Sequence, residues 1–537
     1  MRQGFIKKII MDNKILCIFG FLFSIFLSIF IAFMPVASKY LIDDVLSADN
    51  TQQIYFGILI FFIVCLLQPF FFFIKEKVFI FLCEKIAYSL RIKAFQKFEK
   101  LPLAYFESNS FGELSVKILN DTKEISQYIY VFFSSFVTSL ILLCALFVTM
   151  FIVSWKISLI ITLILLLYSV YVWNTSKKME GYSKKSLELS GKMQDTIKKS
   201  FDNAVLTKVF SAEQYNLQKY VAFSKEAMNI QLSVKGTTTS LNSITMTITS
   251  IALCVVYGVG AIFVLDGQMT LGGLIAMGLF YQALISPLSS LIGSNLSYNK
   301  IKPSLKRIED FFSEEEELGK NSIDNEKPSI VFSNVSFKYP KDDNYAIANL
   351  NFSIQKNGCY VVSGNSGKGK STIAKLILGL YKVDIGDIKL FGENILNIDK
   401  SNLRSKISYV SQDVELINDT IVNNMRIANP NAKVEDIKNL CKYLGLDEKI
   451  MSMKDDYYSL INEKINLSGG EKRRLSIVRG LLKKAAIYIF DEAETYIEET
   501  FVNKLVSLYK QLGEEAIVII ITHNSSIICE FDNIIEI

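Results

Sequence analysis

Six long stretches without a charged side chain dominate the first 300 residues of the chain. Each reaches the length of about 20 residues that a helix needs to cross a bilayer. Soluble helices rarely stay uncharged for so long, so the pattern predicts six transmembrane helices. The stretches are Ile15–Ser38, Thr51–Ile74, Ile125–Trp155, Ile157–Ser176, Gly236–Leu265 and Gly267–Asn299.

Basic residues predict the orientation of these helices. Residues 75–124 hold nine Lys or Arg and residues 177–235 hold eleven Lys, whereas the connections on the other side carry only Lys39 and Lys156. Basic loops remain on the cytoplasmic side, so both termini and both long loops are expected in the cytoplasm. The long loops have a helical pattern. A separate loop domain is one interpretation, but we favour transmembrane helices that continue beyond the bilayer.

The composition changes after residue 299. A polar stretch with four consecutive glutamates, 314–317, is followed from Ile330 by short β-branched runs that alternate with helical segments. Such alternation is typical of an α/β domain with a largely parallel sheet. The sequence therefore predicts a helical membrane domain over residues 1–300, a linker over 301–328 and an α/β domain over 329–537.

Composition and charge limit the function classes. Hydrophobic residues make up 50% and charged residues 21% of the 537 residues, which excludes a disordered chain or a coiled coil. A net charge of +5 gives no reason to expect a nucleic-acid partner. The eight cysteines form no C-x-x-C pair, and a single histidine cannot build a multi-histidine metal site.

A phosphate-binding loop is predicted between the strand that ends at Ser363 and the helix that begins near Ile373. Its glycines let backbone amides face phosphate oxygens, and the following helix adds a positive N-terminus. Lys370 would reach the β- and γ-phosphates of ATP, and the Ser371 hydroxyl would bind Mg²⁺. The nine residues are Gly364, Asn365, Ser366, Gly367, Lys368, Gly369, Lys370, Ser371 and Thr372.

Two carboxylates end the apolar strand Ile487–Phe490. In a nucleoside triphosphatase the first, Asp491, would hold Mg²⁺ and the second, Glu492, would polarise the attacking water. An acidic strand end in solvent is the alternative. Upstream, Ser468, Gly469 and Gly470 open a basic helix, and such a helix start binds anions.

These motifs together resemble an ATP-binding cassette. Leu467–Glu471 is similar to the family signature, which implies contact with the γ-phosphate of the ATP held by a partner cassette. Tyr339 matches the aromatic residue that stacks on adenine, although an ordinary strand-end tyrosine is the alternative. Gln412 matches the glutamine that touches Mg²⁺, and His523, the only histidine, matches the switch histidine that contacts the γ-phosphate.

The membrane half resembles type I ABC exporters. Tyr40–Leu46 follows the first span as in that family, and Leu101–Glu107 and Ser200–Glu213 are similar to its two intracellular coupling regions. The chain departs from the pattern after Ala493, where the family has T-S-A-L-D. Here Glu494 to Glu498 reads E-T-Y-I-E, so the last position keeps a longer carboxylate.

The resemblance implies an ATP-driven exporter half-transporter in a bacterial plasma membrane, with a second copy as partner. Because the six runs carry no charge, we expect an amphipathic or apolar cargo, a peptide first and a lipid or lipophilic drug second. An ATP-gated channel or regulator on the same scaffold is the alternative function. A cassette ATPase that acts on nucleic acid is excluded by the six spans.

Overall fold

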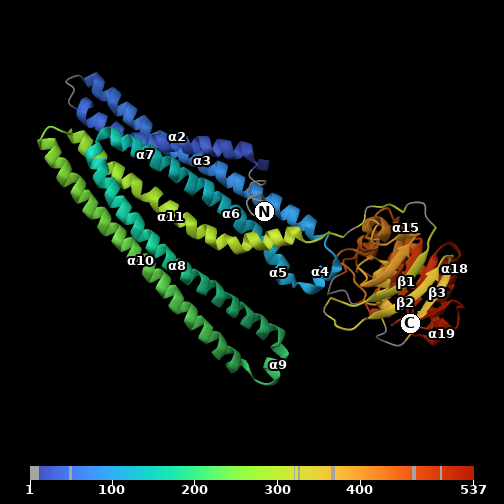
Figure 1. Ribbon diagram of the computed structural model, residues 1–537. Helices are drawn as coiled ribbons and strands as arrows, with labels where there is room; N and C mark the ends of the chain where they lie inside the picture. The colour runs from blue at the N-terminus through green and yellow to red at the C-terminus, as the bar shows by residue number, and fades with distance from the viewer. Residues whose placement is uncertain are drawn as a thin grey trace. The chain divides into compact units, whose positions relative to one another are not determined.

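The computed structural model describes residues 11–46, 51–317, 319, 321–323, 327–340, 342–364, 369–461, 467–495 and 499–537. The chain divides into two compact units, which we describe separately. The helical unit comprises Met1–Gln96 and Leu114–Ser313, and the α/β unit comprises Lys97–Glu113 and Glu314–Ile537. Figure 1 shows the ribbon from the N-terminus to the C-terminus.

Six helices among the described residues are long and apolar enough to cross a membrane, so the predicted number of spans is confirmed. Three of the helical segments are π-helical and carry the label η. The elements are α2 (Lys14–Tyr40), η1 (Leu41–Val45), α3 (Thr51–Phe98), α5 (Phe111–Ser115), η2 (Val116–Asp121), α6 (Thr122–Tyr130), η3 (Val131–Val137), α7 (Thr138–Val153), α8 (Trp155–Asp202), α9 (Ala204–Val209), α10 (Glu213–Leu265) and α11 (Leu271–Ser313).

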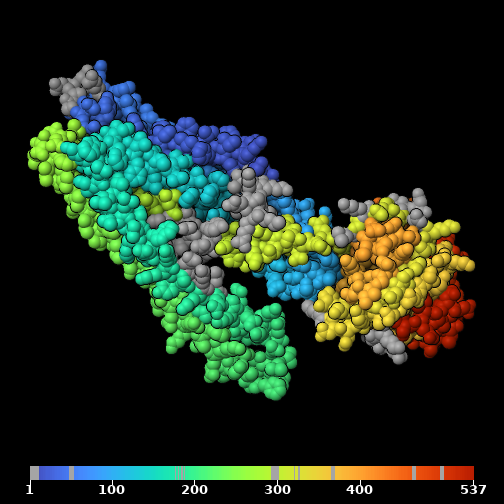
Figure 2. Space-filling view, viewed as in Figure 1, coloured from blue at the N-terminus to red at the C-terminus, as the bar shows by residue number. Residues whose placement is uncertain are grey.

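The long helices extend well beyond the thickness of a bilayer. Helices α3 and α8 have 48 residues each and α10 has 53, which at a 1.5 Å rise corresponds to about 70–80 Å against a hydrocarbon core of about 30 Å. The two long loops are therefore continuations of the spans, as we favoured from the sequence, and not separate loop domains. Helices α8 and α10 lie side by side and form an arm with α9 at its tip (Figures 1 and 2).

The core of the helical unit lies where α2, α7, α8, α10 and α11 meet. Met277, Phe280, Tyr281 and Leu284 of α11 are fully buried there. Helix α11 also continues to Ser313, so it occupies the first part of the predicted linker, residues 301–328.

The α/β unit contains two sheets. A parallel sheet has the order β6-β7-β8-β3-β9, and an antiparallel sheet has the order β2-β1-β4-β5. Strands β7 and β8 are buried along their whole length because helices cover both faces of the parallel sheet. The strands are β1 (Ile330–Phe337), β2 (Ile347–Ile354), β3 (Gly358–Ser363), β4 (Ile385–Leu390), β5 (Glu393–Asn394), β6 (Ile407–Val410), β7 (Ile487–Asp491), β8 (Ile517–Ile521) and β9 (Ile534–Glu536).

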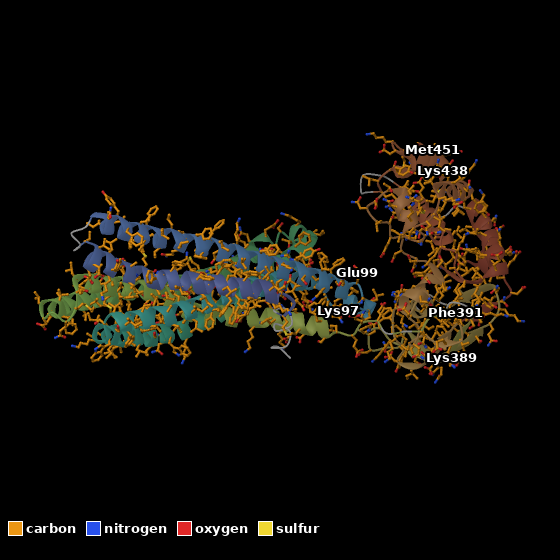
Figure 3. The ribbon with its side chains drawn as sticks, turned by 90° about the horizontal axis from the view of Figure 1, so that it is seen from above. Lys97, Glu99, Lys389, Phe391, Lys438 and Met451 are labelled. Carbon is orange, nitrogen blue, oxygen red and sulfur yellow. The ribbon has the colours of Figure 1, made fainter. Side chains whose placement is uncertain are left out.

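Short helices complete the α/β unit and divide it into two lobes. Figure 3 places Lys389 and Phe391 in the lobe of the antiparallel sheet, and Lys438 and Met451 in a helical lobe at the other end. The predicted fold class is thus confirmed in both parts. The helices are α12 (Lys370–Ile377), α13 (Lys400–Ser405), α14 (Ile421–Arg426), α15 (Val434–Tyr443), α16 (Asp447–Met451), η4 (Asp456–Tyr458), α17 (Gly469–Leu481), α18 (Glu499–Glu515) and α19 (Ser525–Ile528).

Helix α4 (Leu103–Ser108) belongs to the α/β unit although it follows the second span in sequence. Leu103 and Ala104 pack against the core of the antiparallel sheet. The Tyr381 hydroxyl donates a hydrogen bond to Glu107. This first coupling region is therefore fixed to the domain that carries the nucleotide motifs.

Candidate nucleotide site

The predicted nucleotide motifs meet at one edge of the parallel sheet. Strands β3, β7 and β8 are neighbours and run in the same direction, with Asp491 and Val362 both paired to Ile521. The carboxyl ends of parallel strands lie at the same edge, which is where such sheets bind ligands. The end of β3, Asp491–Glu492 and Thr522–His523 are therefore brought together.

The described ends of the phosphate loop have the expected geometry. Gly369 has φ of +85°, and a Cβ there would lie 2.4 Å from the carbonyl oxygen of Ala346, so only glycine fits. Lys370 begins α12, is 7% exposed and donates to the Gly364 carbonyl oxygen at 2.9 Å. The predicted residues Asn365, Ser366, Gly367 and Lys368 lie outside the described residues.

Asp491 and Ser371 provide oxygen ligands suited to Mg²⁺. The Ser371 hydroxyl donates to Asp491 at 3.1 Å, and the Tyr409 hydroxyl donates to the other carboxylate oxygen at 3.1 Å. Asp491 is fully buried, and this burial raises the pKa of its carboxyl. Mg²⁺ is usually held by one or two protein oxygens together with phosphates and water, so these residues fit the ion.

Glu492 forms a polar cluster with Gln412 and His523. Its carboxylate accepts from the Gln412 amide at 2.8 Å and lies 3.3 Å from Nδ1 of His523. The backbone of Glu492 has φ of +46°, a conformation that costs energy in a non-glycine residue and is concentrated at functional sites. The structure thus brings together three side chains that lie far apart in the sequence.

A pocket of about 520 Å³ opens over this cluster. Its walls include Tyr339, Lys370, Ser371, Thr372, Gln412 and Glu492. The Tyr339 hydroxyl is 3.0 Å from that of Thr372, so the ring stands close to α12. Tyr345 also lines the pocket and was missed, as was the contact of Tyr409 with Asp491. Tyr345 belongs to no motif. Tyr409 lies three residues before Gln412, in the segment that resembles the glutamine loop of the family, but that resemblance did not indicate its contact with Asp491.

The signature residues open a well-capped helix. The Ser468 side chain accepts from the Glu471 amide at 3.2 Å, and the Glu471 carboxylate accepts from the Ser468 amide at 2.7 Å. This reciprocal capping box fixes the start of α17. Ser468, Gly469 and Gly470 are absent from the described residues that line the pocket beside Lys370.

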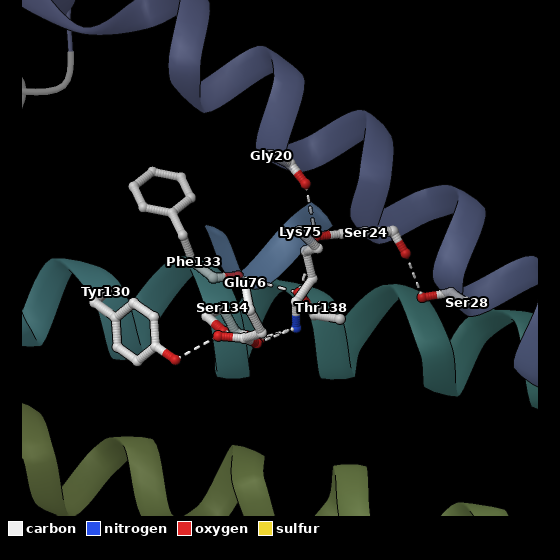
Figure 4. A network of polar contacts seen from close by, with 9 residues as sticks. All are labelled: Gly20, Ser24, Ser28, Lys75, Glu76, Tyr130, Phe133, Ser134 and Thr138. Carbon is white, nitrogen blue, oxygen red and sulfur yellow. Dashed lines mark hydrogen bonds and ion pairs between the residues drawn. The ribbon is translucent and has the colours of Figure 1, made fainter. Parts of the chain in front are cut away.

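A second polar cluster lies in the helical unit, directly after the apolar run of α3. Lys75 is 3% exposed, and its ammonium group is 2.8 Å from Glu76 and 3.3 Å from the Ser134 carbonyl oxygen (Figure 4). Glu76 also accepts from the hydroxyls of Tyr130 at 2.5 Å and Ser134 at 2.8 Å. The 24 residues of α3 that precede the pair correspond to about 36 Å of helix, which places it at the end of the span.

Comparisons with known proteins match both halves of the chain. The model for the ABC transporter transmembrane region matches residues 17–288, and the ABC transporter model matches residues 347–495. A putative multidrug export ATP-binding/permease protein of Bacillus subtilis is 24% identical, covering 94% of this chain and 88% of the relative. The ATP-dependent lipid A-core flippase 2 of Colwellia psychrerythraea is 27% identical, covering 93% of this chain and 86% of the relative.

A solved structure has the same fold. A bacterial Atm1-family ABC exporter with ATP bound aligns over 97% of this chain and 93% of its own, with a TM-score of 0.79 and 23% identity. The alignment spans both the helical and the α/β unit. It supports the fold of each, with the helical half and the nucleotide half on one polypeptide.

Proposed function

The chain belongs to the ABC transporter family, and from that premise we propose that it is an exporter that uses ATP hydrolysis to move an amphipathic or apolar cargo across the membrane. The observation that carries this proposal is the cluster of Glu492, Gln412 and His523 in a pocket beside Lys370 and Ser371. The six spans and the nucleotide domain lie on one chain.

The residues of the pocket divide the work of hydrolysis. Tyr339 would stack on the adenine, and Lys370 would exchange its bond to Gly364 for contact with the phosphates. Glu492 would accept the proton of the attacking water as general base. His523 would orient the γ-phosphate, and Gln412 would hold Glu492 in place until ATP binds. Ser371 and Asp491, with Gln412, would hold Mg²⁺, which neutralises phosphate charge.

A second copy of the chain would complete each ATP site. Ser468, Gly469 and Gly470 do not line the pocket on their own chain, so the γ-phosphate needs a helix start from another subunit. The tip of the α8–α10 arm supports this partner. Phe201, Val205, Val209 and Phe210 are each at least 70% exposed there, and an exposed apolar patch of this kind marks a protein interface.

The cargo is inferred from the spans. The charge-free runs contain no side chain that could form a salt bridge with a substrate, and the Lys75–Glu76 pair that follows one of them is internally neutralised. A relative named for its cargo is a lipid A-core flippase and another is a putative multidrug exporter. These names give no support to a peptide, so we place a lipid or lipophilic drug first.

We further propose that the nucleotide domain and both termini lie in the cytoplasm of a bacterial cell. The lysine-rich segments 75–124 and 177–235 support this orientation. ATP is then available on the side from which the cargo is removed.

Transport by the full chain in proteoliposomes tests the proposal. Fluorescent lipid, a lipophilic dye and an apolar peptide are offered separately, with Glu492→Gln as the inactive control. Accumulation of lipid or dye against a gradient, dependent on ATP and largely insensitive to ionic strength, is expected, because salt screens only exposed charge pairs. Downhill flux alone would identify a channel, and a hydrophilic ion that stimulates hydrolysis only at low salt would contradict the apolar cargo.

A further inference from the structure

A third carboxylate lies behind the predicted catalytic pair. Glu494 stands in the turn after β7, where the family resemblance has threonine, and it is only 8% exposed. The Thr522 hydroxyl donates a hydrogen bond to one of its carboxyl oxygens. Burial raises the pKa of the Glu494 carboxyl. Burying a carboxyl group costs folding free energy unless the group is hydrogen-bonded.

Thr522 connects this carboxyl to the switch histidine. Thr522 is fully buried at the end of β8, and its hydroxyl also accepts from the Asn524 amide at 2.9 Å. The hydroxyl therefore fixes the backbone on both sides of His523. The His523 ring in turn contacts Glu492. The backbone N–H of Glu492, which has a left-handed conformation, donates a hydrogen bond to the Ile521 carbonyl oxygen at 2.8 Å.

Two further polar side chains of the α/β unit, Tyr509 and Arg473, are buried as well. The second carboxyl oxygen of Glu494, the Tyr509 hydroxyl and Nε of Arg473 are all buried without a hydrogen-bond partner in the described part of the chain. These three atoms therefore share no hydrogen bond with one another, and the hydrogen bond from Thr522 is the contact that carries the role of Glu494.

Arg473 holds the loop that carries Gln412. Its guanidinium donates to the carbonyl oxygens of Ser411 at 2.5 Å and of Gln412. The ring centroid of Tyr509 lies 4.6 Å from that of Phe490 in β7. Arg473 and Tyr509 thus support the loop of Gln412 and the strand before Glu492, separately from the hydrogen bond between Thr522 and Glu494.

We infer that Glu494 is a positioning residue for ATP hydrolysis: its carboxyl group holds Thr522, and through it His523, against Glu492. The inference rests on the proposed role of Glu492 as general base. Glu494 does not line the ATP pocket, so it affects turnover and not nucleotide binding.

Steady-state ATPase kinetics of the full chain in detergent test this role. We expect Glu494→Ala to lower kcat by about 10- to 100-fold with KM for ATP within about twofold, as for misplaced catalytic groups. Glu494→Gln keeps an acceptor for Thr522 and should stay within about threefold of the wild-type kcat. A rise in KM with unchanged kcat, or a Gln variant as impaired as the Ala variant, would overturn the inference.

Thr522→Val provides a nearly isosteric second variant that remains informative if Glu494→Ala fails to fold. It should lower kcat at least as much as Glu494→Ala, because it removes the hydrogen bond to Glu494 and also the one from the Asn524 amide. The double variant Thr522→Val/Glu494→Ala should be no worse than Thr522→Val alone, because both changes remove the same hydrogen bond between Thr522 and Glu494. Additive losses would contradict the proposed path. Glu492→Gln is measured in parallel: if it retains turnover, the role of Glu492 fails, whereas a dead Glu492→Gln beside fully active Glu494 and Thr522 variants refutes only the present inference.

Discussion

At the scale of single residues, Glu492 is the group that we propose as general base. Its carboxylate is held by Gln412 and His523 at the mouth of the pocket. Glu492→Gln should lower ATP hydrolysis by about 100-fold or more, because a general base contributes roughly 10²–10⁴-fold. ATP should still bind. Phosphate release and binding of a fluorescent ATP analogue, measured on the same preparation, check both parts; wild-type turnover would place the base elsewhere.

The buried carboxyl of Glu494 gives the nucleotide domain a pH-dependent stability. Burial raises the pKa of this carboxyl in the folded protein above its ordinary value of 4.5. Its contribution to the free energy of unfolding is therefore greatest at acid pH and is lost as the pH rises through the pKa of the folded protein. Glu494→Gln should therefore raise the thermal midpoint relative to wild type, increasingly so from about pH 4.5 upward. The exposed Glu514→Gln on α18 is the control. A difference that shrinks as pH rises would contradict this sign.

The residues with a sequence signature were predictable, and their neighbours were not. Lys370, Asp491 and His523 follow strands whose ends must share one sheet edge, so their proximity followed from the order of the motifs. Tyr345 belongs to no motif and the glutamine-loop motif gave Tyr409 no role, because the places of both tyrosines depend on how a loop and β6 pack. The roles predicted for the site residues remain predictions.

At the scale of elements, the Lys75–Glu76 pair fastens α3 to the helix that contains Tyr130 and Ser134. Glu76→Gln leaves the Lys75 charge buried without its partner and should cost about 3 kcal/mol or more. Lys75→Met/Glu76→Gln removes both charges and should recover most of that loss. Thermal midpoints in detergent, with the exposed Glu84→Gln of α3 as control, measure both. A double variant no more stable than Glu76→Gln would show that the loss comes from packing.

Element types followed from the sequence more reliably than their ends. Uncharged runs identify helices because lipid cannot satisfy backbone groups, but they mark only the apolar part of each helix. Helix α3 continues through charged residues to Phe98 because its C-terminal part packs against other helices, and α11 continues to Ser313 for the same reason. Likewise, only tertiary contacts such as Tyr381–Glu107 show that α4 joins the α/β unit.

At the scale of the whole molecule, the pocket and the signature helix of one chain belong to different ATP sites. If two chains exchange them, each site contains Lys370 from one chain and Ser468 from the other. A bulky cation at 468 would block the capped start of α17 and so disable the site built on the partner's phosphate loop. Ser468→Arg and Lys370→Ala should therefore damage the same ATP site when they are on different chains, and both ATP sites when they are on the same chain.

Mixed dimers with differently tagged chains make this arrangement measurable. With Ser468→Arg on one chain and Lys370→Ala on the other, both defects fall in one site, and the intact second site should retain up to about half of the wild-type turnover. With both changes on the same chain, each site has one defect and turnover should be nearly lost. The exposed Ser507→Arg replaces Ser468→Arg as control. Equal turnover in the two arrangements would mean that each chain builds its ATP site alone.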